Sequence, residues 1–525
     1  MEPEPTGSRP EPQEPRPPSD ARPDPGAGPE APYTLRIPLR EGESGEQRMA
    51  RSLDDSYIWV EETLERHEAI RPRWSRARSG PTPFRSRLQT PQVLILGFAA
   101  IILLGTLLLK LPWASATGEP ISWMDAFFTA TSATTVTGLV VLNTANDFSR
   151  FGHVVILILI QVGGVGFISF SVLLFRLVGR RVTLRERVVI QQSLGAGGAG
   201  GVVNLAVTIL IVTLSLEAVG ALLLWLRWRQ TMPDGEALWL AIFHAVSAYC
   251  NAGFDLFSGT DRGVVFGYGS DYYTLTVMGV LILLGSWGIA VLYDLVTYRR
   301  GRSLALNTRI TLILAGILTV AGGMVLLLDP NFYQILEGRP PGERFAMGLF
   351  TIISARTAGL TILPLEELSE ASQFILMVWM FIGGAPASMA GGVTSSTVGV
   401  LLIAVLATAR GAPEATAFHR TVPTETIAKA VAIMTVSTLL VSGVTLALTL
   451  LHEGPIFVTG FEVVSAFANA GYSLSFTGNL DTLGRLLIAF TMFWGRLGPL
   501  TIVVALAQRE HPTLVHYPEE PVILG

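Results

Sequence analysis

Long apolar stretches alternate with shorter ones along most of this chain. A helix needs about 20 predominantly apolar residues to cross a bilayer. Eight stretches reach that length, at residues 92–113, 152–178, 203–226, 273–296, 309–328, 374–408, 427–451 and 485–507. Within each successive pair lies a shorter apolar stretch: Trp123–Thr134, Leu238–Cys250, Arg344–Ser354 and Val458–Ala468. These four are too short to cross, so they indicate half-helices that enter the membrane and turn back.

Each short stretch runs into a small-residue turn built around one glycine. The four segments read TSATTVTGLVV (131–141), VSAYCNAGFDL (246–256), ISARTAGLTIL (353–363) and VSAFANAGYSL (464–474). Their glycines are Gly138, Gly253, Gly359 and Gly471, separated by 253 − 138 = 115, 359 − 253 = 106 and 471 − 359 = 112 residues. One such turn means little, but four at near-equal spacing are hard to explain as chance. They predict an all-α membrane protein in which four parallel helix–pore-loop–helix repeats surround a central pore with fourfold pseudosymmetry, giving eight transmembrane helices and four re-entrant half-helices.

The repeats and the residues before them divide the chain into six parts. The first 50 residues are dominated by proline and charge, which predicts a disordered cytoplasmic tail. Residues 51–90 form a basic segment with a short amphipathic helix. The four repeats then occupy residues 91–190, 191–302, 303–420 and 421–525, the last ending in a short cytoplasmic C-terminus.

Composition and charge agree with a membrane location. The 525 residues are 50% hydrophobic and 15% charged, whereas soluble domains carry about 25% charged residues. Arginines cluster before the first apolar stretch and after the second long stretch of each repeat. The positive-inside rule therefore places both termini in the cytoplasm and the glycine turns on the outer side of a multi-pass cell (inner) membrane protein. The single cysteine, Cys250, excludes an internal disulfide.

The four turns have the chemistry of a site for a monovalent cation. Non-helical backbone is tolerated inside a membrane only where protein buries it or water reaches it. Carbonyl oxygens from four such loops can replace the hydration shell of an ion, and the negative end of each preceding half-helix would face it. No ring of acidic side chains appears in the turns, which argues against a divalent-cation site of the carboxylate type. The predicted ion-binding residues are Val136, Thr137, Gly138, Asn251, Ala252, Gly253, Thr357, Ala358, Gly359, Asn469, Ala470 and Gly471.

These turns resemble the filter loops of the Trk/Ktr/HKT potassium transporter superfamily. The resemblance covers residues 90–510 and includes the segments QVGGVG (161–166) and FWGRLGP (493–499). Eight spans make the chain most similar to the Ktr-type membrane subunit. The resemblance implies potassium uptake, a homodimer and a cytosolic ring of nucleotide-binding regulatory subunits. Glycine at position 138, where some sodium-transporting relatives have serine, favours potassium.

The sixth long stretch predicts a broken helix. Residues 383–397 are almost all small or polar, and glycine and proline disfavour a continuous helix there. The resemblance implies an intramembrane loop that gates the pore, formed by Gly383, Gly384, Gly391, Gly392 and Thr394, the last standing where the family often has lysine. It also implies that Arg496 lies under the filter as an electrostatic barrier. A structural salt bridge from Arg496 to Asp294 or Glu462 is the competing interpretation.

Other functions find less support in the residues. We find no catalytic cluster, no metal-ligand spacing among the histidines and no phosphate-binding loop, so the chain is not predicted to be an enzyme or to bind a cofactor or nucleic acid. K⁺ is the expected substrate at the filter, and Na⁺ as a coupling ion is left open. Glu217 fits a buried acid as well as a coupling-ion ligand. The alternatives are a sodium-permissive or sodium-coupled relative, or a secondary carrier of a small solute.

Overall fold

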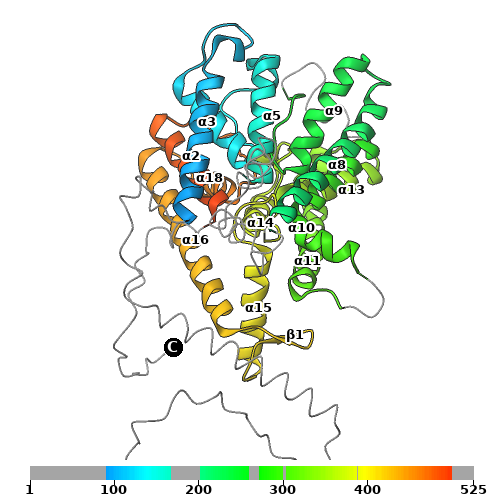
Figure 1. The fold of residues 1–525 in the computed structure, drawn as a ribbon, viewed down its shortest axis with the longest axis vertical. Coiled ribbons are helices and arrows are strands. Elements are labelled where there is room, and N and C mark those ends of the chain that lie inside the picture. The colour runs from blue at the N-terminus through cyan, green and yellow to red at the C-terminus, as the bar shows by residue number, and fades with distance from the viewer. Residues whose placement is uncertain (1–89, 167–201, 259–270, 299–302, 387, 499–525) are drawn as a thin grey trace, which may run out of the picture. The chain divides into compact units, whose positions relative to one another are not determined.

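The computed structural model describes residues 90–166, 202–258, 271–298, 303–386 and 388–498, and most of them are helical (Figure 1). The predictions for the N-terminal tail, the basic segment and the residues after 498 lie outside these ranges. So do the C-terminal parts of the second and eighth apolar stretches.

The long apolar stretches of the sequence form the outer helices. They are α2 (Thr90–Leu109), α5 (Arg150–Val165), α8 (Val202–Trp228), α10 (Tyr272–Val296), α11 (Leu306–Leu328), α14 (Glu370–Phe381), α15 (Ser395–Ala409), α16 (Thr424–Leu451) and α18 (Thr482–Leu497). Among the described residues, four helices are long and apolar enough to cross a membrane: α8, α10, α11 and α16.

The four short apolar stretches form the predicted short helices: α3 (Trp123–Thr135), α9 (Asp234–Tyr249), α13 (Pro341–Ala355) and α17 (Ile456–Ala468). Ser122 caps the start of α3 by accepting the backbone N–H of Asp125. Proline is the N-cap residue of the other three, and α13 has a second proline at its first helical position, where the missing N–H costs nothing. All four helices end in the glycine turns.

The short helices pack in a closed cycle. Each contacts the two helices formed by the long apolar stretches before and after it: α2 and α5 for α3, α8 and α10 for α9, α11 and α14 for α13, and α16 and α18 for α17. Each also contacts a helix of the preceding segment: α9 packs on α5, α13 on α10, and α17 on α14. The contact of α18 with α3 brings the last segment back to the first.

Glycines end or interrupt the second long helix of the first, second and fourth segments. α5 ends at Gly166 and α18 at Gly498, both with φ above +80°, and α10 is interrupted at Gly288 (φ 70°, ψ 165°). The sixth apolar stretch is broken between α14 and α15, where its glycines and proline predict a break.

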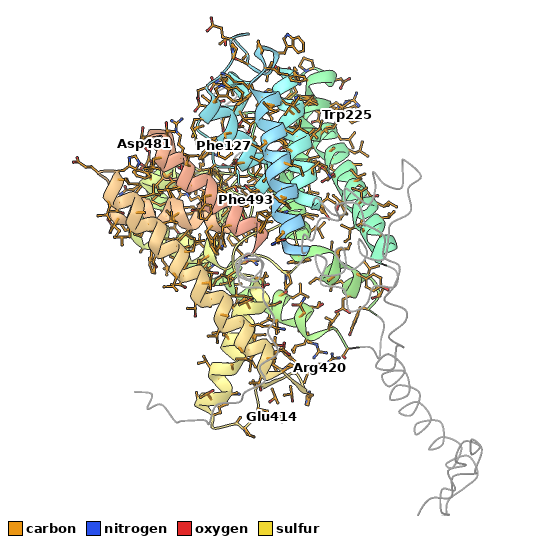
Figure 2. The ribbon with its side chains drawn as sticks, turned by 60° about the vertical axis from the view of Figure 1, so that its left-hand side comes forward. Phe127, Trp225, Glu414, Arg420, Asp481 and Phe493 are labelled. Atoms are coloured by element: carbon orange, nitrogen blue, oxygen red, sulfur yellow. The ribbon has the colours of Figure 1, made fainter. Side chains whose placement is uncertain are left out.

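The remaining elements are short and join the helices. They are η2 (Pro112–Ala114), α4 (Thr144–Asp147), α12 (Pro330–Ile335), η4 (Leu365–Glu367), η5 (Thr477–Asn479), β1 (Thr416–Ala417) and β2 (Arg420–Thr421). The two strands pair antiparallel between α15 and α16. Figure 2 shows Glu414 and Arg420 at the tip of this helical hairpin, at the opposite end of the helices from Asp481.

Candidate functional site

The same backbone hydrogen bond occurs in each of the four glycine turns. In each turn the residue before the glycine donates its N–H to the carbonyl oxygen of a serine near the end of the short helix. The pairs are Thr137–Ser132 (2.8 Å), Ala252–Ser247 (2.7 Å), Ala358–Ser354 (2.8 Å) and Ala470–Ser465 (3.0 Å). This bond closes the last helical turn and fixes where the chain leaves the helix.

Three turns have a further left-handed residue, and one does not. Val136, Asn251 and Asn469 have φ between 51 and 59°. Asparagine tolerates this conformation, whereas it is an outlier for a β-branched valine. The third turn is one residue shorter, because its glycine lies 359 − 354 = 5 positions after the serine, whereas that of the first turn lies 138 − 132 = 6 positions after it. Thr357 takes the corresponding place, two residues before its glycine, and does not have a positive φ.

The four glycines lie against neighbouring turns in a closed ring. A Cβ built on Gly138 would lie 2.6 Å from the carbonyl oxygen of Ala252, and one on Gly253 would lie 2.6 Å from that of Ala358. The approach is closer still from Gly359 to the oxygen of Ala470 and from Gly471 to the oxygen of Thr137. All four glycines also have φ between +65 and +85°. Both the conformation and the space therefore favour glycine, and any side chain in these positions must displace the neighbouring carbonyl.

Asparagine side chains link the turns in pairs. Asn469 donates to the hydroxyl of Thr137 (2.8 Å) and to the carbonyl of Met492 in α18 (2.9 Å). Asn251 lies 3.0 Å from the hydroxyl of Thr357. With its amide nitrogen facing that hydroxyl, Asn251 would also donate to Ile282 in α10, which repeats the pattern of Asn469. The fourth turn is thus joined to the first and the second to the third.

The predicted ion-binding residues are therefore brought together, and their side chains are buried. Thr137, Asn251, Ala252, Ala358 and Ala470 are at most 1% exposed, as are Val136, Thr357 and Asn469. The neutral side chains are used for packing and for links between turns. Backbone carbonyls are left as the groups that could face an ion, at the C-terminal, negative ends of four short helices.

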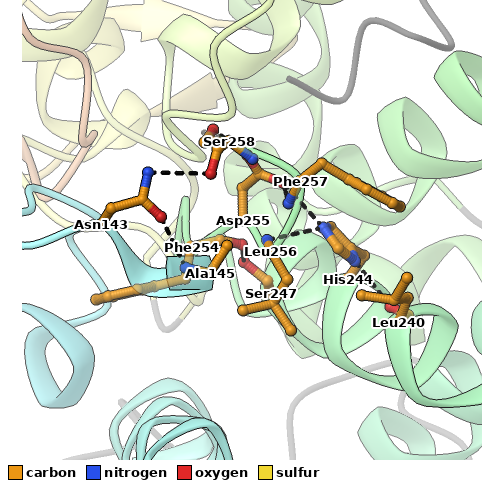
Figure 3. A network of polar contacts seen from close by, with 10 residues as sticks. All are labelled: Asn143, Ala145, Leu240, His244, Ser247, Phe254, Asp255, Leu256, Phe257 and Ser258. Carbon is orange, nitrogen blue, oxygen red and sulfur yellow. Dashed lines mark hydrogen bonds and ion pairs between the residues drawn. The ribbon is translucent and has the colours of Figure 1, made fainter. Parts of the chain in front are cut away.

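Polar networks hold the chain just beyond the second and fourth turns. In Figure 3, the imidazole Nε2 of His244 lies 3.1 Å from Asp255, which also accepts the N–H groups of Phe257 and Ser258 (2.7 and 2.9 Å). Burial alone would raise the pKa of Asp255, but the bonds from His244, Ser258 and Phe257 outweigh it and hold the pKa below its ordinary value. In the fourth turn the buried Glu462 accepts four hydrogen bonds from residues 473–477.

The loop of residues 382–394 lies against the ring and against α10. Gly391 packs on the side chain of Asn469, and Gly392, with φ +74°, packs on Ala468. The backbone N–H groups of Ala385 and Met389 donate to Ser286 and Gly285 (2.9 and 3.2 Å). Gly383 lies against the backbone carbonyl of Gly391, and Gly384 lies against that of Ser286. The loop is thus anchored between the fourth turn and α10.

Thr394 ends this loop with a structural role of its own. It is the N-cap of α15, and its hydroxyl accepts the backbone N–H of Thr397. A lysine could not provide this hydroxyl cap.

Arg496 joins the loop to α5. Its guanidinium donates to the carbonyl oxygens of Gly163 (2.6 Å) and Gly164 (2.9 Å) and to that of Met389. The two glycines are in the last turn of α5, where carbonyls have no helical partner because the helix ends at Gly166.

The competing salt-bridge interpretation of Arg496 is wrong for its proposed partners. Asp294 accepts the backbone N–H of Ala305, and Glu462 is committed to the fourth turn. Glu217 is 4% exposed and accepts from the thiol of the fully buried Cys250 (3.5 Å), which fits the buried, hydrogen-bonded acid.

Sequence reasoning missed two sets of residues. The serines at the ends of the short helices were visible in the repeated Ser-Ala pairs of all four segments. The second set contains Gly163, Gly285 and Gly495, whose Cα atoms lie against the carbonyls of Thr134, Tyr249 and Phe467. Their signal was the recurrence of glycine three residues later, at 166, 288 and 498. Gly163 and Gly495 lie in the two segments quoted for the resemblance, but this packing role was not assigned to them.

Among the described residues, a mostly helical fold with four helices long and apolar enough to cross a membrane is that of a multi-pass membrane protein. Residues 73–517 match the family model TrkH, described as a cation transport protein. The chain belongs to this family.

Individual relatives agree. The chain is 35% identical to the Ktr system potassium uptake protein B of Bacillus subtilis, over 84% of this chain and 97% of that protein. It is 33% identical to the potassium/sodium uptake protein NtpJ of Enterococcus hirae, over 84% and 98%. The Ktr-type membrane subunit is thus the supported subgroup. The fold matches the crystal structure of the potassium transporter TrkH from Vibrio parahaemolyticus with a TM-score of 0.64 and 20% identity, over 83% of this chain and 88% of that one.

Proposed function

We propose that this chain takes up potassium across the cell membrane, with the ions passing through the ring of four glycine turns. The observation that carries the proposal is the closed cycle in which each glycine lies against the carbonyl of the next turn. Four small-residue turns at the negative ends of four short helices offer carbonyl oxygens to a dehydrated monovalent cation. The printed names of the two relatives support potassium as the ion. Four parallel repeats with fourfold pseudosymmetry are the architecture that such a ring implies.

The loop of residues 382–394 is the proposed gate. It is anchored to the fourth turn, and Arg496 ties it to the end of α5. A guanidinium at this place repels a cation that has passed the ring. Conduction requires that the loop move aside, which breaks the bond between Arg496 and Met389.

The proposed assembly is a homodimer with a cytosolic ring of nucleotide-binding regulatory subunits, and both termini in the cytoplasm. The B. subtilis relative is named as protein B of a Ktr system, which supports a further component. These regulatory subunits would act on the gate from the cytoplasmic side.

A sodium-permissive pore is the second candidate. The name of the E. hirae relative includes sodium as well as potassium, at nearly the same identity.

Uptake of rubidium-86 into proteoliposomes that contain only this chain tests the proposal and separates the two candidates. An inside-negative potential drives uptake, and K⁺ or Na⁺ is added outside as competitor. Potassium uptake predicts that K⁺ blocks at far lower concentration than Na⁺, whereas equal block identifies the sodium-permissive pore. Liposomes without uptake, both alone and with regulatory subunits added, would refute both candidates.

A further inference from the structure

Two of the four short helices carry a fully buried ionisable side chain at the same distance from the turn glycine. His244 lies nine residues before Gly253 (253 − 244 = 9), and Glu462 lies nine before Gly471 (471 − 462 = 9). Both are completely buried. Each contacts the segment that leaves the turn after its glycine.

His244 holds this segment in the second turn through a carboxylate (Figure 3). Its Nε2 lies 3.1 Å from Asp255, and the backbone N–H of Leu256 approaches the same nitrogen at 3.3 Å. Nδ1 lies 2.8 Å from the carbonyl of Leu240, one helical turn back. The ring of His244 is also stacked on Phe257, with the ring centroids 4.7 Å apart.

Glu462 holds the corresponding segment of the fourth turn directly. It accepts from the hydroxyl of Ser473 (2.5 Å) and from the backbone N–H of Leu474 (2.8 Å). Ser473 and Asp255 both lie two residues after the turn glycine, and Leu474 and Leu256 lie three after it. The two sites thus make the same pair of contacts with different chemistry.

The His244 contact bears directly on the ring. The hydroxyl of Ser247 donates to the carbonyl of Phe254 (2.7 Å), the residue that follows Gly253. Beyond Asp255, the carbonyl of Ser258 accepts from Asn143 in the first segment (3.0 Å). The pair of His244 and Asp255 lies between these two attachments, so it determines where the chain runs as it leaves the ring.

We propose that His244 is a positioning residue for the second turn, which acts through Asp255 to set how strongly the ring prefers potassium over sodium. This inference rests on the proposed function, because it assigns ion selection to the ring. It also states that the Glu–Ser pair of the fourth turn is an equivalent solution. A pair exchange can therefore test it.

The experiment compares His244→Glu, Asp255→Ser and the double variant, which recreates in the second turn the Glu–Ser pair of the fourth. The readout is the ratio of Na⁺ to K⁺ concentrations that halve rubidium-86 uptake in proteoliposomes. Each single variant loses the buried hydrogen bond between position 244 and the charged group at position 255. We expect this loss to lower the ratio about tenfold in each single variant. The double variant returns to within about twofold of wild type, because the exchanged pair restores the contacts of the residues two and three after the glycine. The N–H groups of Phe257 and Ser258, which Asp255 also accepts, lose that partner and account for the remaining difference.

His452→Gln is the matched control. His452 also pairs with an aspartate, Asp481, at 3.0 Å, but that aspartate is the N-cap of α18 and not a residue of a turn. We expect His452→Gln to keep the wild-type ratio of the Na⁺ and K⁺ concentrations that halve uptake.

Each outcome decides the inference. The inference is supported if the double variant folds and has the wild-type ratio while the single variants have lowered ratios. This holds even if one of the single variants fails to fold, because the other still provides the comparison. A wild-type ratio in Asp255→Ser overturns it, as does a low ratio or failure to fold in the double variant. A wild-type protein blocked equally by both ions refutes potassium selectivity itself, which is a failure of the proposed function and is seen before any variant is made.

Discussion

Alanine substitution of the turn glycines should destroy ion selectivity through contact and not through backbone strain. A Cβ at position 138 would lie 2.6 Å from the carbonyl oxygen of Ala252, whereas ordinary contacts begin at 3.4 Å. The carbonyl must therefore move by 3.4 − 2.6 = 0.8 Å. An error of about 1 Å in the placement of a reacting group costs about 100-fold in catalysis. By analogy, Gly138→Ala should lower the preference for potassium over sodium by about tenfold or more.

The four positions should differ in degree. The contact is closer at Gly359 and Gly471 than at Gly138 and Gly253, so alanine at the former two should reduce both selectivity and total uptake further. The left-handed backbone conformation adds a cost of about 1–2 kcal/mol that all four share.

Gly118→Ala is the control that isolates the contact. Gly118 has φ +77°, similar to the turn glycines, but a Cβ there would meet nothing within 4 Å. We expect this variant to lose some thermal stability and to keep the wild-type ratio in the rubidium-86 competition assay. Wild-type selectivity in Gly471→Ala, or the same loss of selectivity in Gly118→Ala, would refute the reasoning.

Three further predictions concern the gate and the second turn. Arg496→Gln should raise the initial rate of rubidium-86 uptake, because it weakens the tie to Met389 and removes the barrier charge; an unchanged or lower rate in folded protein contradicts the gating role. Thr394→Ala removes the cap of α15 and should cost about 0.5–2 kcal/mol, seen as a lower thermal midpoint in detergent, while Thr394→Ser should retain the midpoint. The pKa of Asp255 is lower in the folded protein than its ordinary value of 3.8, so the ionised carboxylate stabilises the fold at pH values above 3.8. This stabilisation is lost as the pH falls through the lower pKa of the folded state. The stability advantage of wild type over Asp255→Asn should therefore be constant near neutral pH and narrow only under strong acidification; narrowing between pH 7 and 5 would contradict the assignment.

The sequence predicted the helical elements well, because their boundaries have local causes. The first short helix was expected at Trp123–Thr134 and spans Trp123–Thr135, and the last was expected from Val458 and begins at Ile456. Proline and capping residues start these helices, and small-residue turns end them. The break in the sixth stretch follows in the same way from its glycines and proline.

Other features depend on contacts between distant segments and could not be predicted. Nothing in the local sequence around Val136 indicates a left-handed valine, since its β-branched side chain opposes that conformation. The interruption of α10 at Gly288 was hidden in a continuous apolar stretch. The partners of Arg496 are backbone carbonyls, which every residue has, so no residue type marks them.

The shorter third turn shows that the four quarters of the ring are not copies of one another. In a pore assembled from four identical chains, a single codon change alters all four sides at once. Here each turn is encoded separately, so mutation can adjust one side while three keep their geometry. Such a ring can drift in ion preference by small steps during evolution, and its present asymmetry is what that history would leave behind.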